Sequence, residues 1–224
     1  MRYVFKNMNK AIFYLLIVSL LFISCVSLDT KEIVKSMYNV PETGASDFDG
    51  TKYVRMKNIS CIKKDVGLLF DLYQDSKMAK KNIVILTLKV TGYHSIADGR
   101  SLHFNIDGEI IDLKTMDDIT AVEEVYPSIY QPGYIGSDIY IPSVYSPAVQ
   151  ASTKRYVVTD TFVDKVANSK KVVMRADLAR TYVEGICSPQ ESDAWNKDNE
   201  WLKEYSGTYG FRSFVELMKS LSTQ

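Results

Sequence analysis

The stretch that decides the fold is Asn82–Met116, NIVILTLKVTGYHSIADGRSLHFNIDGEIIDLKTM. Two turn signals, Asp98-Gly99 and Asp107-Gly108, divide it into runs of strand length. Asp-Gly between alternating apolar residues is typical of a hairpin turn. We therefore predict a three-stranded antiparallel meander over residues 82–116, which the rest of the chain covers.

The register of this meander follows from its alternation. In the first strand the even positions are all apolar: Val84, Leu86, Leu88 and Val90. Since successive side chains of a strand point to opposite faces, the even face is predicted to lie in the core. A two-residue turn at Asp107-Gly108 pairs Phe104 with Ile111 and Leu102 with Leu113, which continues one apolar face.

The N-terminus has the layout of a secretory signal. Met1–Lys10 carries three basic residues and no acid, and the 14 residues from Ala11 to Ser24 carry no charge. This run is shorter than the roughly 20 residues of a membrane-spanning helix. It ends in Phe22-Ile23-Ser24-Cys25, which resembles the lipobox of bacterial lipoproteins, although Phe22 stands where that family usually has Leu, Val or Ile. The resemblance implies removal of residues 1–24 and acylation of Cys25.

Two other interpretations of the N-terminus remain open. The uncharged run extends to Leu28, and its 18 residues are near the lower limit for an uncleaved membrane anchor. An ordinary cleaved signal peptide is the third interpretation. All three export the remaining chain. Val26 and Ser27 lack the aspartate that retains many such lipoproteins in the inner membrane, so the resemblance implies the outer membrane.

The mature chain is nearly neutral and long enough for one domain. Removal of residues 1–24 takes away three of the 27 basic residues and no acidic one, which leaves 24 basic and 27 acidic residues. A balanced charge argues against nucleic acid as a partner. Residues 25–50 are polar and are predicted to form a flexible tether, and residues 51–224 to form a single α+β domain.

The other predicted elements make this domain mainly antiparallel β. Strands are expected at residues 52–61, 67–73, 138–141 and 155–159, a short helix at 160–167, a hairpin at 170–176 and 181–187, and helices at 189–205 and 211–221. The short helix with Phe162, Val163 and Val166, followed by a Val-Val-x-Arg strand, resembles a pattern in uncharacterised secreted lipoproteins. That resemblance implies no activity.

Two cysteines remain once Cys25 is assigned to a lipid. Cys61 and Cys187 can form a disulfide in an exported chain, or they can be two small buried thiols on separate strands. We favour the two thiols at this point, and the disulfide stays open. The sequence has no Cys-x-x-Cys motif and no Cys/His cluster.

The closest approach to a catalytic motif is Tyr93-His94-Ser95 followed by Asp98. Neighbours on a strand point to opposite faces, whereas a Ser-His-Asp site needs all three groups together, so we interpret this motif as a turn. A metal between His94 and His103 would need further ligands, and we predict neither a metal nor another cofactor. We therefore assign no catalytic residue.

The best candidate for binding is the segment 126–147, which contains four prolines and five tyrosines: Tyr126, Tyr130, Tyr134, Tyr140 and Tyr145. Tyrosine offers a large apolar area and a hydroxyl group at low entropic cost. Covering of the core by this loop is the plainer interpretation.

These observations predict a lipid-anchored protein of the bacterial cell envelope. Its expected role is a non-enzymatic binding or structural module, with a protein or glycan as its partner. The competing hypothesis is a periplasmic or surface hydrolase. A concave pocket that holds a buried Asp, Glu or His pair would favour the hydrolase, and an exposed tyrosine surface at 126–145 would favour the binding module.

Overall fold

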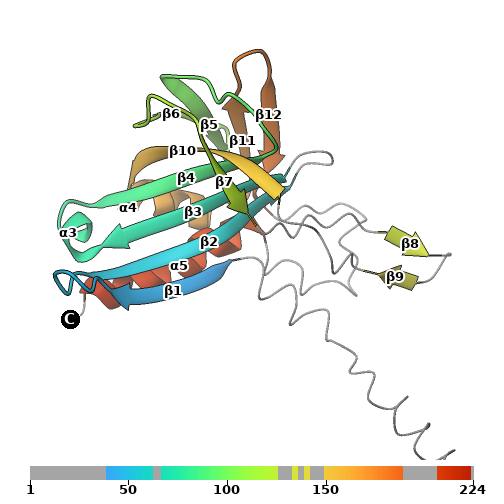
Figure 1. Cartoon of the computed structure of the whole chain (residues 1–224). Coiled ribbons are helices and arrows are strands. Elements are labelled where there is room, and N and C mark those ends of the chain that lie inside the picture. Colours follow the sequence, from blue (N-terminus) through green and yellow to red (C-terminus); the bar gives the residue numbers. More distant parts are fainter. Residues whose placement is uncertain are drawn as a thin grey trace, which may run out of the picture. The chain divides into compact units, whose positions relative to one another are not determined.

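The computed structural model describes residues 39–62, 67–125, 133–135, 139–141, 149–188 and 206–222. These described residues are mainly antiparallel β with three helices, an α+β fold with a sandwich-like arrangement (Figure 1), as the alternation predicts. The predicted helix at 189–205 and most of the segment 126–147 lie outside the described residues, as does the whole region before residue 39, including Cys25.

Ten strands form the large sheet: β1 (Val40–Ala45), β2 (Lys52–Ile62), β3 (Gly67–Asp75), β4 (Ile83–Thr91), β5 (Arg100–Ile106), β6 (Glu109–Lys114), β7 (Ala121–Val125), β10 (Val149–Thr159), β11 (Val172–Asp177) and β12 (Tyr182–Ile186). The helices are α3 (Ser76–Ala79), α4 (Asp160–Asn168) and α5 (Gly207–Ser222). A separate two-stranded sheet consists of β8 (Gly133–Ile135) and β9 (Ile139–Ile141).

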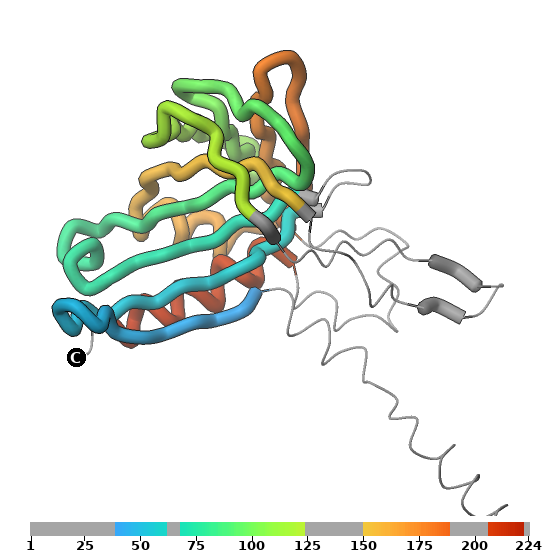
Figure 2. The backbone as a smooth tube through the Cα atoms, viewed as in Figure 1, coloured from blue at the N-terminus to red at the C-terminus, as the bar shows by residue number. Residues whose placement is uncertain are grey.

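The large sheet has two halves. Its strand order is β6-β5-β11-β12-β2-β3-β4-β10-β7, with β1 paired on β2. The first half, β6, β5, β11 and β12, bends away from the second half, and the tube in Figure 2 follows this bend. The sheet curls back on itself because Thr115, which follows β6, bridges to Tyr156 on β10. The apolar faces of both halves therefore turn toward one core.

The register predicted within the two strands after residue 99 is confirmed. Phe104 pairs with Ile111 and Leu102 with Leu113, across a turn in which Asp107 and Gly108 have φ angles of 51° and 97°. Two consecutive positive φ angles match the right-handed twist of a hairpin, which explains the Asp-Gly sequence.

The prediction that residues 82–116 form one meander is wrong. β4 pairs with β3 and β10, whereas β5 pairs with β6 and β11. Residues 92–99 do not make a hairpin turn but cross from one half of the sheet to the other, with bridges from Gly92 to Ala151 and from Ile96 to Leu178. The even-numbered side chains of β4 and of β5 both point into the same core, so the alternation is satisfied without pairing of β4 with β5.

The predicted tether also needs correction. The sequence predicts a flexible tether over residues 25–50, but Val40–Ala45 form the edge strand β1. This strand pairs along β2 from Val40↔Lys57 to Ala45↔Lys52. Only alternate residues of this strand are partly buried, and Pro41 and Gly44 obscure its alternation. Proline is tolerated there because an edge strand has one side without ladder hydrogen bonds.

Most of the other predicted elements are present, although the strand expected at 155–159, β10, begins at Val149 and β7 was not predicted. The strands expected at 52–61 and 67–73 are β2 and β3, the predicted hairpin is β11 with β12, and the strand expected at 138–141 is β9. Thr159 caps α4 by accepting a hydrogen bond from the backbone of Phe162. The last predicted helix, 211–221, is α5, which begins earlier, at Gly207.

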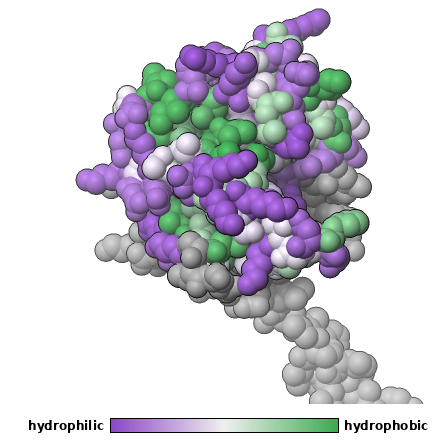
Figure 3. Space-filling model, turned by 90° about the vertical axis from the view of Figure 1, so that its left-hand side faces the viewer, coloured by the Kyte–Doolittle hydropathy of each residue, from purple (hydrophilic) through white to green (hydrophobic). Residues whose placement is uncertain are grey.

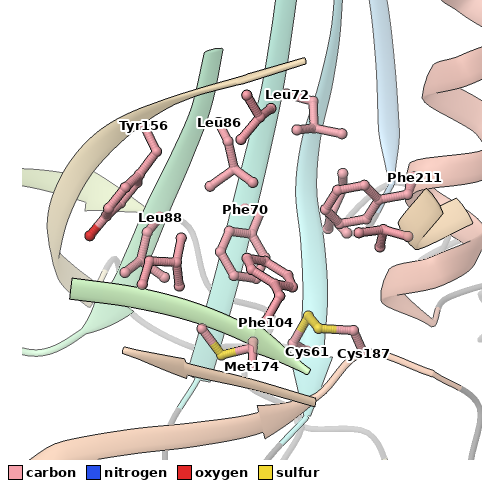
Figure 4. Close-up of a cluster of buried hydrophobic side chains, with 14 of the residues drawn as sticks. Cys61, Phe70, Leu72, Leu86, Leu88, Phe104, Tyr156, Met174, Cys187 and Phe211 are labelled. Carbon is pink, nitrogen blue, oxygen red and sulfur yellow. A yellow bond between two sulfur atoms is a disulfide. The ribbon is translucent and has the colours of Figure 1, made fainter. Parts of the chain in front are cut away.

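The core is organised around contacts between aromatic rings. Phe70 on β3 lies 5.8 Å from Phe104 on β5 between ring centroids (Figure 4). The Phe104 ring also packs edge-to-face with Phe162 on α4, with 5.2 Å between centroids. Phe104 is completely buried. One side chain thus contacts both halves of the sheet and a helix.

The Cys61–Cys187 disulfide lies where the two halves of the sheet join. β12 and β2 share one paired position, Ile186↔Ile62, and the disulfide follows directly, with its sulfurs 2.08 Å apart. Of the two alternatives left by the sequence, the structure therefore has the bonded pair. α5 packs closely on it: a Cβ at Gly207 would come within 2.9 Å of the Ser60 carbonyl oxygen, so only glycine fits at this contact.

The central position of Phe104 leads to a stability prediction. Phe104→Ala is expected to lower the free energy of unfolding by about 3–5 kcal/mol, because it removes the ring that joins three elements and leaves a cavity. Ile110→Ala is the matched control, since Ile110 is 69% exposed on the neighbouring strand and its loss is expected to cost less than about 0.5 kcal/mol. Urea unfolding measures both, and equal midpoints would contradict the arrangement of the core.

The disulfide leads to a second prediction. The double substitution Cys61→Ala with Cys187→Ala is expected to lower stability by roughly 4–5 kcal/mol in the chain-entropy model, because the bond closes a loop between residues 126 apart in sequence. Thermal unfolding of the wild-type and double-variant proteins without reductant checks this. An unchanged melting temperature would mean that the wild-type protein carries two free thiols.

Candidate functional site

The crossing segment at residues 92–99 holds the Ser-His-Asp sequence that we interpret as a turn, and its groups have separate partners. The backbone N–H of His94 donates to Ser152 Oγ at 2.7 Å, and its ring Nε2 lies 3.0 Å from the carbonyl oxygen of Thr91. The Asp98 carboxylate accepts from Lys154 Nζ at 2.5 Å. The hydrogen bonds of His94 and the ion pair of Asp98 therefore hold this segment in place across the sheet.

His103 lies on the outer face of β5, away from His94, between two carboxylates. Its Nδ1 is 2.7 Å from Asp112 on β6 and its Nε2 is 3.1 Å from Asp177 on β11. Asp177 also accepts from Arg175 Nε at 2.8 Å, and the Arg175 guanidinium stacks 4.1 Å from the ring centroid of Tyr182. The cluster ties together the outer surfaces of β6, β5, β11 and β12.

The two carboxylates alter the protonation of His103. Partial burial lowers the pKa of His103, but hydrogen bonds with Asp112 and Asp177 outweigh this effect and raise the pKa above its ordinary value. For Asp177, burial alone would raise the pKa, whereas the hydrogen bonds from His103 and Arg175 lower it. Both shifts favour a charged imidazolium beside charged carboxylates.

The inner face of β10 carries a row of polar side chains that the sequence did not predict. Ser152, Lys154 and Tyr156 occupy alternate positions and are buried, and the Tyr156 hydroxyl lies 2.9 Å from Ser101 Oγ. Burial raises the pKa of Tyr156 to about 12, against the smaller opposing effect of the hydrogen bond with Ser101. In the sequence, the residues of this row stand at every second position of a run that ends in apolar Val158, and this spacing places them all on one face of the strand.

A second group of charges lies on the opposite face of the same half-sheet. Asp71 on β3 is 2% exposed, and it pairs with Arg55 Nη2 at 2.5 Å and Lys89 Nζ at 3.0 Å. Lys89, 7% exposed, also contacts Glu123 on β7 at 2.9 Å. These ion pairs cross four elements and hold β7 near β4. Their internal pairing is typical of buried charges, which need partners to offset desolvation.

An open groove lies between the β1–β2 hairpin and the last turn of α5. Its volume is about 320 Å³, and Thr43, Ala45, Lys52, Tyr53 and Leu221 are among its lining residues. The charged group in this lining is a lysine, so the groove does not bring together the buried Asp, Glu or His pair that would favour a hydrolase.

None of the described residues that line this groove is one of the five predicted binding tyrosines. Tyr126, Tyr130 and Tyr145 lie outside the described residues, and only the backbone of Tyr134 and Tyr140 is described, as a paired position of β8 and β9. Within the described ranges, no three His, Cys, Asp or Glu side chains are arranged so that they could hold a metal ion.

Comparison with known proteins gives no family for this chain: no protein-family model matches it, and no curated protein matches its sequence. Of the helices in the described ranges, none is both long and apolar enough to span a bilayer.

The His103 cluster predicts a pH-dependent contribution to stability. A raised folded pKa means that the stabilisation is complete below the ordinary pKa of about 6.5 and is lost as the pH rises through the folded value. His103→Gln is therefore expected to destabilise the protein more at pH 6 than at pH 9 in urea unfolding.

The matched control is Asp112→Asn combined with Asp177→Asn, in which the imidazole loses both carboxylate partners. In that background only partial burial acts on the pKa of His103, so His103→Gln is expected to cost no more at pH 6 than at pH 9. A larger cost at pH 9 than at pH 6 in the wild-type background would contradict the assigned ion pairs.

Proposed function

We propose that the protein is an exported lipoprotein of the bacterial cell envelope, held at the membrane through acylated Cys25. We further propose that its β domain is a non-enzymatic binding or structural module whose partner is a protein or glycan of the envelope. The segment with Tyr126, Tyr130, Tyr134, Tyr140 and Tyr145 is the proposed contact region.

The observation that carries the proposal of export is the Cys61–Cys187 disulfide. Disulfides form and persist in oxidising compartments outside the cytoplasm, and they are rare inside it. Both cysteines are buried and the bond joins the two halves of the sheet, so the folded domain is built around the oxidised form. This agrees with the secretory layout of residues 1–24, which is independent of it.

The proposal of a non-enzymatic role rests on what the reactive groups do. Tyr156 and Ser101 are hydrogen-bonded to each other inside the core, and His103 contacts a carboxylate at each ring nitrogen. Asp71 is held by two cations. A general base or nucleophile must reach a substrate, whereas these groups are committed to partners that join strands.

Lipid attachment can be tested by growing cells with radioactive or alkyne-tagged palmitate. The wild-type protein is expected to carry the label and Cys25→Ala to lose it, because this thiol is the proposed acylation site. Ser27→Ala is the matched control, since it alters a neighbouring residue but keeps the cysteine. Label that persists in Cys25→Ala would contradict the anchor.

The binding role can be tested on the same proteins. Affinity isolation from the membrane is expected to recover an envelope partner with the wild-type chain and to lose it with Cys25→Ala. Labelling of the wild-type chain by a fluorophosphonate probe, which reacts with activated serines, would contradict the non-enzymatic role.

A further inference from the structure

Two turns lie side by side at one end of the domain. Residues 46–51 join β1 to β2, and residues 76–82, which include α3, join β3 to β4. Lys77 Nζ of the second turn lies 2.6 Å from Asp49 Oδ2 of the first. Figure 1 shows both turns at the left-hand end, and Figure 3 views that end, where hydrophilic side chains surround smaller apolar patches.

The first turn presents an aromatic ring to solvent. Phe48 has a relative exposure of 103%, the highest among the exposed large hydrophobic residues of the described chain. A ring in this position contributes nothing to the core, because burial of apolar area is what stabilises the fold. Its apolar area is therefore available to an external partner.

The second turn presents positive charge beside that ring. Lys77, Lys80 and Lys81 are all exposed. Three aspartates lie in or beside these turns: Asp75 caps α3 by accepting from the backbone of Lys77 and Met78, Asp49 accepts from Lys77, and Asp47 is exposed. Lys80 and Lys81 follow on the turn that Lys77 joins to Asp49, the residue after Phe48. With Lys52 at the start of β2, the two turns carry four lysines against three aspartates, on a mature chain whose acids outnumber its bases.

We propose that this end of the domain, the Phe48–Lys81 tip, docks on an anionic membrane surface. An aromatic side chain enters the headgroup region and lysines attract anionic lipids, which together form an interfacial contact. The groove beside the tip, lined in part by Lys52, adds a recess at the same end. This inference rests on the proposed lipid anchor, and it names the surface that meets the membrane.

The chain length between anchor and domain permits this contact. Residues 25–38 can span up to about 48 Å when fully extended. β1 leads from Asn39 to the tip over roughly 20 Å, so the anchored domain can turn its tip to the bilayer. Anchoring also raises the effective concentration of membrane at the tip, so a contact of few residues suffices.

A single-site fluorescent probe tests the proposal in the full-length, lipidated protein. Phe48→Cys provides one reactive thiol, because Cys25 is acylated and Cys61 is bonded to Cys187. The protein is labelled with an environment-sensitive dye and reconstituted into vesicles of phosphatidylcholine with phosphatidylglycerol. We expect a blue shift of emission and quenching by nitroxide-labelled lipids. Tyr93→Cys is the matched control, since Tyr93 is a 77% exposed aromatic residue of the crossing segment, and it is expected to stay unquenched.

The charge requirement is tested with Lys80→Gln and Lys81→Gln together, which are expected to abolish the quenching at position 48. Lys170→Gln with Lys171→Gln is the control, because this exposed pair lies on the connection between α4 and β11. Equal dye emission at positions 48 and 93 in vesicles that carry the protein would overturn the docking but leave the anchor intact. Protein that fails to float with the vesicles would overturn both.

Discussion

The contact between Phe70 and Phe104 is the interaction on which the rest of the structure depends. These rings belong to opposite halves of the sheet, and the second ring also meets Phe162 on α4. Offset and edge-to-face ring pairs add about 0.5–1.5 kcal/mol to the burial of their apolar area. The contact fixes how far the sheet bends and where α4 can lie, and the outer faces are then free to carry the charged clusters.

The bend leaves little backbone pairing where the two halves of the sheet meet, and one covalent and one polar connection strengthen this junction. β12 meets β2 at a single paired position, beside which the Cys61–Cys187 bond closes the core. At the other side, residues 92–99 cross between the halves and are held by the buried Lys154 through Asp98. An oxidising compartment would therefore supply part of the stability of this fold, which links the architecture to the proposed export.

The sequence predicts faces and local hairpins well because both depend on neighbouring residues. The Phe104↔Ile111 register follows from alternation and a two-residue turn, and it also sets His103 opposite Asp112. The pairing of β4 with β3 and β10, and of β5 with β11, could not be predicted, because β4 and β5 turn their apolar faces into one core whether or not they pair with each other. The contacts of His103 with Asp177 and of Tyr156 with Ser101 depend on those distant pairings, so they could not be predicted either.

We propose that the protein is an exported domain closed by the Cys61–Cys187 bond. The most direct measurement traps thiols in intact cells with an alkylating reagent, fractionates the envelope and maps peptides by mass spectrometry without reduction. We expect the protein in the membrane fraction, with the peptides that hold these two cysteines linked to each other. Alkylated Cys61 and Cys187 on protein recovered from the cytosol would contradict this proposal.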